Sequence, residues 1–135
     1  MSITIPASCK VYDFYHSSMW LNNGIFYVKY KYDLIIDIRV AKEIVKDRKK
    51  ISKGICSPFL LDITELLFID TPSREYLVSS DAHEFLNAGA IYTKDKLLSF
   101  LGGAWILLDK PSIPIRVFND ESAAIRWLTP FTNLN

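Results

Sequence analysis

The feature that most constrains the fold is an apolar run that ends in an acid and leads into a helix start. Residues 58–62 read Pro-Phe-Leu-Leu-Asp, and a short apolar connection then reaches Asp70-Thr71-Pro72. A short, almost wholly apolar segment is typical of a strand buried on both faces of a sheet. Thr71 suits an N-cap, and Pro72 suits the first helical position because its missing N–H loses no hydrogen bond there. Residues 58–77 therefore predict a central strand, a loop and a helix, with their junction presented outward, where α/β sheets usually meet ligands and partners.

The N-terminal part of the chain predicts a β-hairpin. Two β-rich runs, 10–21 and 25–32, flank Asn22-Asn23-Gly24, and Asn-Gly between such runs is a strong hairpin signal. Apolar and polar residues alternate in the second run, which predicts one face in the core and one partly wet. The hairpin is also rich in tyrosine, a side chain that suits a surface meeting a partner because its ring is apolar and its tip polar.

The rest of the chain alternates between helices and strands. Asp37 can cap a helix at 38–52, and Asp81-Ala82-His83-Glu84 resembles a further helix start. Further predicted elements are strands at 88–92 and 115–118, a helix from 94 that Gly102-Gly103 interrupts, and a final helix at 121–128. This order predicts one α/β domain over residues 1–135. Its sheet is mixed but largely parallel, is opened by the N-terminal hairpin and carries about four helices.

Composition excludes several classes of function. The chain of 135 residues is half hydrophobic with a net charge of +1, so it has enough apolar residues for a core and no general attraction to nucleic acid. The basic residues between Lys46 and Lys53 are expected to be a solvated helix end. No apolar run approaches the roughly 20 residues of a membrane span. The N-terminus also lacks the features of a signal peptide, so we expect a cytoplasmic protein.

The residues that carry chemistry form no recognisable catalytic set. His16, His83, Cys9 and Cys56 have no metal-ligand spacing, so we expect no metal and two reduced thiols. The five glycines form no phosphate-binding loop, and no Gly-x-Ser-x-Gly elbow is present. Acids such as Asp62 also end strands and precede helices without catalysing anything. We therefore expect a protein that is not an enzyme and needs no cofactor.

The central stretch resembles a known signature. Leu61-Asp62-Ile63-Thr64, followed by Phe68-Ile69-Asp70-Thr71-Pro72-Ser73, is similar to STAS domains, the anti-sigma-factor antagonists related to SpoIIAA. These read approximately Leu-Asp-Leu-Ser and then Ile-Asp-Ser-Ser-Gly at a helix start. Residues 73–77, 110–114 and 124–128 resemble segments of an uncharacterised bacterial STAS-like group. The resemblance implies a SpoIIAA-like fold and a regulatory role in protein interaction.

The resemblance also implies candidate site residues. In the antagonist family a kinase phosphorylates the second Ser of Asp-Ser-Ser-Gly, but here Pro72 occupies that position and Ser73 replaces the Gly. Thr71 or Ser73 could substitute as the acceptor; alternatively, Thr71 only caps the helix. The candidates for partner binding or phosphorylation are Asp62, Thr64, Asp70, Thr71, Ser73 and Arg74.

Two functions follow as hypotheses. The first is a non-catalytic, STAS-like interaction module that binds an unidentified protein partner, with a homodimer as one form of it. The second is a binder of a small apolar ligand or lipid in a cleft of the same fold, which would use the aromatic hairpin and the apolar segment 98–108 around Trp105. The alternative for that segment is ordinary core.

Overall fold

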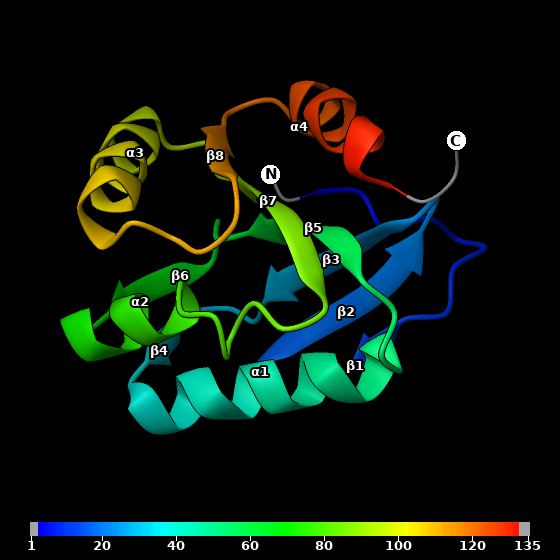
Figure 1. Cartoon of the computed structure of the whole chain (residues 1–135), viewed down its shortest axis with the longest axis horizontal. Coiled ribbons are helices and arrows are strands. Elements are labelled where there is room, and N and C mark those ends of the chain that lie inside the picture. Colours follow the sequence, from blue (N-terminus) through cyan, green and yellow to red (C-terminus); the bar gives the residue numbers. More distant parts are fainter. Residues whose placement is uncertain (1–2, 133–135) are drawn as a thin grey trace.

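The computed structural model of the chain describes residues 3–132, without the side chains of residues 97, 99, 100 and 106–108. Six strands form the main sheet, in the order β1-β2-β3-β5-β7-β8 (Figure 1). Their bounds are β1 Tyr12–Asp13, β2 Ser17–Asn22, β3 Ile25–Tyr30, β5 Ser57–Asp62, β7 Leu86–Tyr92 and β8 Ile115–Phe118. Four α-helices are described, α1 Ile38–Ser52, α2 Thr71–Leu77, α3 Lys96–Asp109 and α4 Glu121–Leu128, and a 3-10 turn follows at Thr129–Phe131.

The sheet is mixed and largely parallel. Strands β1, β2 and β3 pair antiparallel, whereas β3, β5, β7 and β8 pair parallel. The β2–β3 connection is the predicted hairpin, in which Asn23 and Gly24 both have positive φ values, 51° and 79°. Such angles suit the tight turns that match the twist of two paired strands. The predicted sheet, opened by an N-terminal hairpin, is therefore confirmed.

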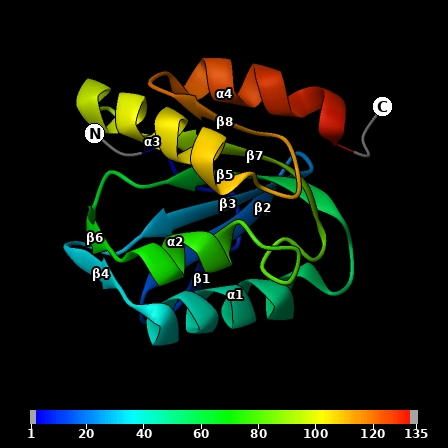
Figure 2. The ribbon, with the colours of Figure 1, turned by 60° about the vertical axis from the view of Figure 1, so that its left-hand side comes forward.

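Helices cover both faces of this sheet. Figure 2 shows α1 and α4 on opposite sides of the strands. One core cluster joins Phe26 and Val28 of β3 to Ile44 of α1, and the other joins Tyr27 of β3 to Leu128 of α4. The prediction that one face of β3 is partly wet is wrong, because α4 and the N-terminal segment cover the second face.

Three local predictions also fail. Asp70, not Thr71, is the N-cap of α2, and its carboxylate accepts a hydrogen bond from the Ser73 N–H at 2.9 Å. Both residue types cap helices well. Pro72 therefore occupies the second helical position instead of the first, which costs no hydrogen bond because the N–H groups of the first turn have no partner within the helix. Residues 81–85 form turns and no helix. Helix α3 runs through Gly102-Gly103 without interruption, although the packing of part of segment 98–108 lies outside the described side chains.

The sequence pattern did not predict a second, two-stranded sheet. Strands β4 (Leu34–Ile36) and β6 (Leu66–Ile69) pair parallel and lie beside α2, apart from the main sheet (Figures 1 and 2). Strand β6 occupies the apolar connection that leads from β5 to α2. The small sheet therefore lies directly before the predicted junction.

Candidate functional site

Asp62, the acid at the end of β5, lies in the interior. It is 1% exposed, and its carboxylate accepts hydrogen bonds from the Ile3 N–H at 2.9 Å and the Thr64 N–H at 2.8 Å. The Thr64 hydroxyl donates to it as well. This candidate residue therefore does not lie on the surface, and its carboxylate finds within the chain the hydrogen-bond partners that burial requires.

The candidate residues at the start of α2 differ in their exposure to solvent. One carboxylate oxygen of Asp70 caps the helix by accepting the Ser73 N–H. Thr71 is exposed, whereas Ser73 is fully buried. Of the two residues that could replace the phosphorylated serine, Thr71 is thus the accessible one. Phosphorylation at either position stays a prediction.

Arg74 faces α3. Its Nε donates to the Asp109 carboxylate at 2.7 Å, and its guanidinium lies 5.1 Å from the centre of the Trp105 ring. The Asp109 side chain is 7% exposed and that of Arg74 is 22% exposed. A charge-assisted hydrogen bond at this burial ties α2 to α3.

An exposed apolar patch lies on the outer face of the small sheet. Ile35 and Phe68 are paired in register, and Leu67 is an extra residue that a β-bulge inserts into β6. Ile35, Leu67 and Phe68 are 55%, 63% and 59% exposed. We call these three residues the β4–β6 patch. Because the bulge turns two consecutive large side chains outward, strand alternation alone does not reveal the patch.

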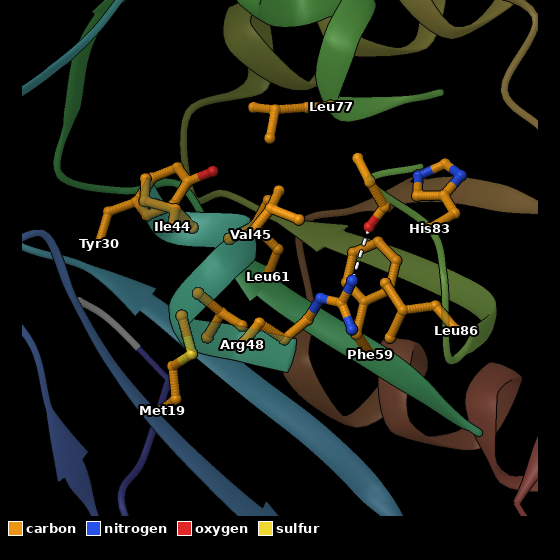
Figure 3. Close-up of a pocket in the computed structure, with 12 residues that line it drawn as sticks. Met19, Tyr30, Ile44, Val45, Arg48, Phe59, Leu61, Leu77, His83 and Leu86 are labelled. Atoms are coloured by element: carbon orange, nitrogen blue, oxygen red, sulfur yellow. Dashed lines mark hydrogen bonds between the residues drawn. The ribbon is translucent and has the colours of Figure 1, made fainter. Parts of the chain in front are cut away.

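A cavity lies between the main sheet and the helices α1, α2 and α3. It has two adjoining lobes of about 80 and 120 Å³. The α1 lobe reaches Ile44 and Arg48, and the α3 lobe reaches Trp105 and Asp109. Both lobes are lined by Tyr30, Phe59, Leu61, Leu77 and His83. Figure 3 shows residues around the α1 lobe, among them Arg48 of α1 and Phe59 of β5.

Burial perturbs three titratable groups of the α1 lobe, and it raises the pKa of the Tyr30 hydroxyl. Desolvation lowers the pKa of Arg48 to about 10, against the opposing charge of Glu84. Desolvation, helped by the nearby positive charge of Arg48, lowers the pKa of His83 to about 4. His83 is therefore neutral at neutral pH, with its Nδ1 2.8 Å from the Ser112 hydroxyl. At neutral pH the described lining of the lobe therefore includes one cation, one neutral imidazole and the neutral Tyr30 hydroxyl among apolar side chains.

Arg48 is buried, although it lies within a basic run that the sequence predicted to be a solvated helix end, and it was not among the predicted site residues. Its position on α1 carried a usable signal. Arg48 follows Ile44 by one full turn, on the stripe that also holds Ala41 and Ile51. A charged residue on an apolar stripe is a candidate for a buried functional group.

The described part of the chain contains neither a candidate metal site nor a candidate membrane-spanning helix. No three His, Cys, Asp or Glu side chains there come together as metal ligands. Among residues 3–132, no helix has the length and hydrophobicity needed to cross a membrane.

Comparison with known proteins gives a family and a fold. A family model described as "Domain of unknown function (DUF7793)" matches residues 19–132. Among solved structures, the chain is similar to an uncharacterized protein of the DUF3478 family from Shewanella loihica PV-4, which has a SpoIIAA-like fold. The two are 15% identical with a TM-score of 0.57, and the match covers 90% of this chain and 92% of the other. No curated protein matches. The SpoIIAA-like fold that the central stretch predicted is confirmed.

Proposed function

We propose, from the premise that the chain belongs to the DUF7793 family and has a SpoIIAA-like fold, that it is a non-catalytic, STAS-like module that binds a protein partner. The observation that carries this proposal is the β4–β6 patch. Large apolar side chains gathered on a surface usually mark an interaction site. Ile35, Leu67 and Phe68 would form the apolar centre of the contact.

The place of the patch in the chain supports a regulatory role. Thr71 is exposed and follows Phe68 closely, at the start of α2. A phosphate on Thr71 would add negative charge next to an apolar contact and would weaken it through desolvation. The proposed module would thus bind its partner in the unmodified state.

Affinity purification of the tagged chain from its own cells tests the interaction. The variant Leu67→Ser/Phe68→Ser should lose the partner that the wild-type chain retains. The variant Ile55→Ser should keep it, since Ile55 is 64% exposed but lies after α1 and outside the patch. Light scattering of the pure protein separates the two kinds of partner, because a mass of twice 15.5 kDa that falls to 15.5 kDa in the double variant indicates a homodimer.

Two results would contradict the proposal. One is identical recovery of partners, and identical mass, by the wild-type chain and the Leu67→Ser/Phe68→Ser variant. The other is turnover of phosphoesters or nucleotides by the purified protein at a rate that is lost on mutating Asp70, which would make the protein an enzyme.

The cavity supports a second candidate function, the binding of a small apolar ligand. Its lining includes Tyr30 from the aromatic hairpin and Trp105 from the apolar segment, the two parts of the chain that this hypothesis names. Apolar cavities with a few polar groups are the usual form of ligand sites. Native mass spectrometry of protein purified from its own cells should show an added mass, and repeated preparations with only the apo mass would contradict it.

A further inference from the structure

We propose that the cavity binds a small apolar carboxylic acid as its anion, with the carboxylate paired to Arg48 and the apolar part held between β5, α1 and α2. This inference rests on the second candidate function, the cavity as a ligand site. It names the chemical class of the ligand and the residue that selects it.

Arg48 is a buried cation with few partners. It is 5% exposed, and its guanidinium donates to the Ala82 carbonyl oxygen at 2.7 Å (dashed line in Figure 3) and to the Ser52 hydroxyl at 3.4 Å. A guanidinium has five N–H donors, so these two neutral acceptors leave part of its hydrogen-bonding capacity unused.

Arg48 forms no ion pair with any carboxylate of the described chain. The two acids whose charges reach it, Asp81 and Glu84, instead form ion pairs with Lys49, at 3.4 and 3.2 Å. A buried cation without a direct ion pair is costly, and an incoming anion would reduce that cost. The positive charge of the site therefore favours an anionic ligand. A carboxylate suits the planar guanidinium, because the two groups can form a pair of parallel hydrogen bonds.

The walls of the cavity limit the rest of the ligand. Phe59, Leu61 and Leu77 line both lobes, and His83 is neutral at neutral pH, so Arg48 is the one charged group among the described residues of the α1 lobe. The α3 lobe holds Arg74 and Asp109, which neutralise each other. These walls favour a single negative charge on an apolar body.

The volume of the cavity limits the size of the ligand. The lobes, of about 80 and 120 Å³, are of the same order as the roughly 150 Å³ apolar cavity that accepts benzene. A ligand with one aromatic ring or a short alkyl chain that spans both lobes matches this size.

Two nearly isosteric probes, benzoate and benzamide, test the role of charge in the full-length protein. Titrations followed by NMR should show benzoate binding at least about tenfold more tightly than benzamide, because only the anion pairs with the guanidinium. The Nε–H resonance of Arg48 should shift with benzoate and stay in place with benzamide. Hexanoate and hexanamide repeat the comparison with an alkyl chain.

Two variants on the same helix test the role of Arg48. Arg48→Met should abolish the preference for the anion, whereas Arg39→Met should keep it, since Arg39 is exposed and pairs with Glu43. If Arg48→Met fails to fold, the Arg48 resonance of the wild-type protein still decides the question.

The outcomes separate the inference from the function on which it rests. Equal binding of acid and amide, with no shift of the Arg48 resonance, would overturn the inference and leave an apolar ligand site. No binding of any of the four probes would overturn the inference, and the apo mass in native mass spectrometry would then overturn the ligand-binding function as well.

Discussion

At the scale of single residues, buried polar groups hold separate parts of the chain together. The Asp62 carboxylate joins the N-terminal segment to the end of β5 through Ile3, and it fixes the next turn through Thr64. His83 reaches the loop before β8 through Ser112. Because a buried polar group that loses its partner keeps its desolvation cost, each of these residues has an effect that denaturation can measure.

Replacing Asp62 with Ala should destabilise the fold by about 2–3 kcal/mol, because it leaves the N–H groups of Ile3 and Thr64 without their acceptor. Urea denaturation measures the free energy of unfolding, and hydrogen exchange at Ile3 should accelerate. The control is Glu75→Ala, an exposed acid on α2, which should change stability by at most about 0.5 kcal/mol. Equal effects of the two substitutions would show that Asp62 does not hold the N-terminal segment.

His83 should make the folded state less stable as the pH falls. Its pKa is about 4 in the folded state, whereas 6.5 is the ordinary value for histidine, so the unfolded chain takes up the proton first. Its contribution to stability is complete above pH 6.5 and is lost progressively from pH 6.5 down to about 4. Urea midpoints of the wild-type protein and His83→Gln should therefore converge over that range. Parallel pH profiles of the two proteins would contradict a neutral, buried His83.

At the scale of secondary structure, local patterns predict the elements that rely on local signals. The hairpin follows from Asn23-Gly24, the start of α1 from Asp37 and the start of α4 from Asp120. Strands β4 and β6 escape such reasoning because they are short and pair with each other across a long stretch of chain. Their pairing is decided by the packing of Ile36 and Ile69 in the core, which no local pattern encodes.

The candidate site is likewise predictable only where it depends on neighbouring residues in the sequence. The sequence indicates the junction before α2, since the resemblance rests on consecutive residues. The cavity is different, because α1, β5, α2 and the turn at His83 each contribute one wall. Whether Arg48 meets solvent or a cavity depends on where His83 and Leu77 pack, and these lie far from it in the sequence.

Helix α3 shows why a pair of glycines need not end a helix. A Cβ added at Gly102 would lie 3.4 Å from Cγ2 of Val117 in β8, whereas one added at Gly103 would have nothing within 4 Å. Gly103→Ala should therefore stabilise the protein by about 0.5–1 kcal/mol, because alanine orders a helix at a lower entropic cost. Thermal denaturation measures this gain. Gly102→Ala, on the same helix, should gain less, and the reverse order would contradict the packing of α3 on β8.

The contact between β7 and β5 determines the position of Phe59. A Cβ at Gly89 would lie 2.2 Å from the Phe59 ring, so Gly89→Ala must displace this ring, which lines the cavity. The cost should be about 1–3 kcal/mol in urea denaturation. The double variant Gly89→Ala/Phe59→Leu should recover part of it, because leucine lacks the clashing atoms. Purely additive effects of the two substitutions would show that the ring is not the obstacle.

At the scale of the whole molecule, two layers of helices enclose the sheet in different ways. Helix α4 packs against a closed core that includes Trp20 and Leu60, whereas α1, α2 and α3 surround the cavity. The β4–β6 patch and the cavity both adjoin α2, which follows β6 directly and contributes Leu77 to the cavity lining. Helix α2 is thus the element through which the proposed partner surface and the proposed ligand site would be coupled.

The Arg74–Asp109 pair is the contact that holds α2 and α3 over the α3 lobe, so its loss should open the molecule there. Asp109→Asn should cost about 1–3 kcal/mol, because both side chains are mostly buried and Arg74 would keep its charge without a counter-ion. Hydrogen exchange should then accelerate in α2 and α3 while α4, which packs on the opposite face, stays protected. Asp33→Asn is the matched control, since Asp33 is exposed with a φ of 54° that asparagine adopts readily. If Asp109→Asn exchanged like Asp33→Asn, the ion pair would not be what holds α2 and α3 together over the α3 lobe.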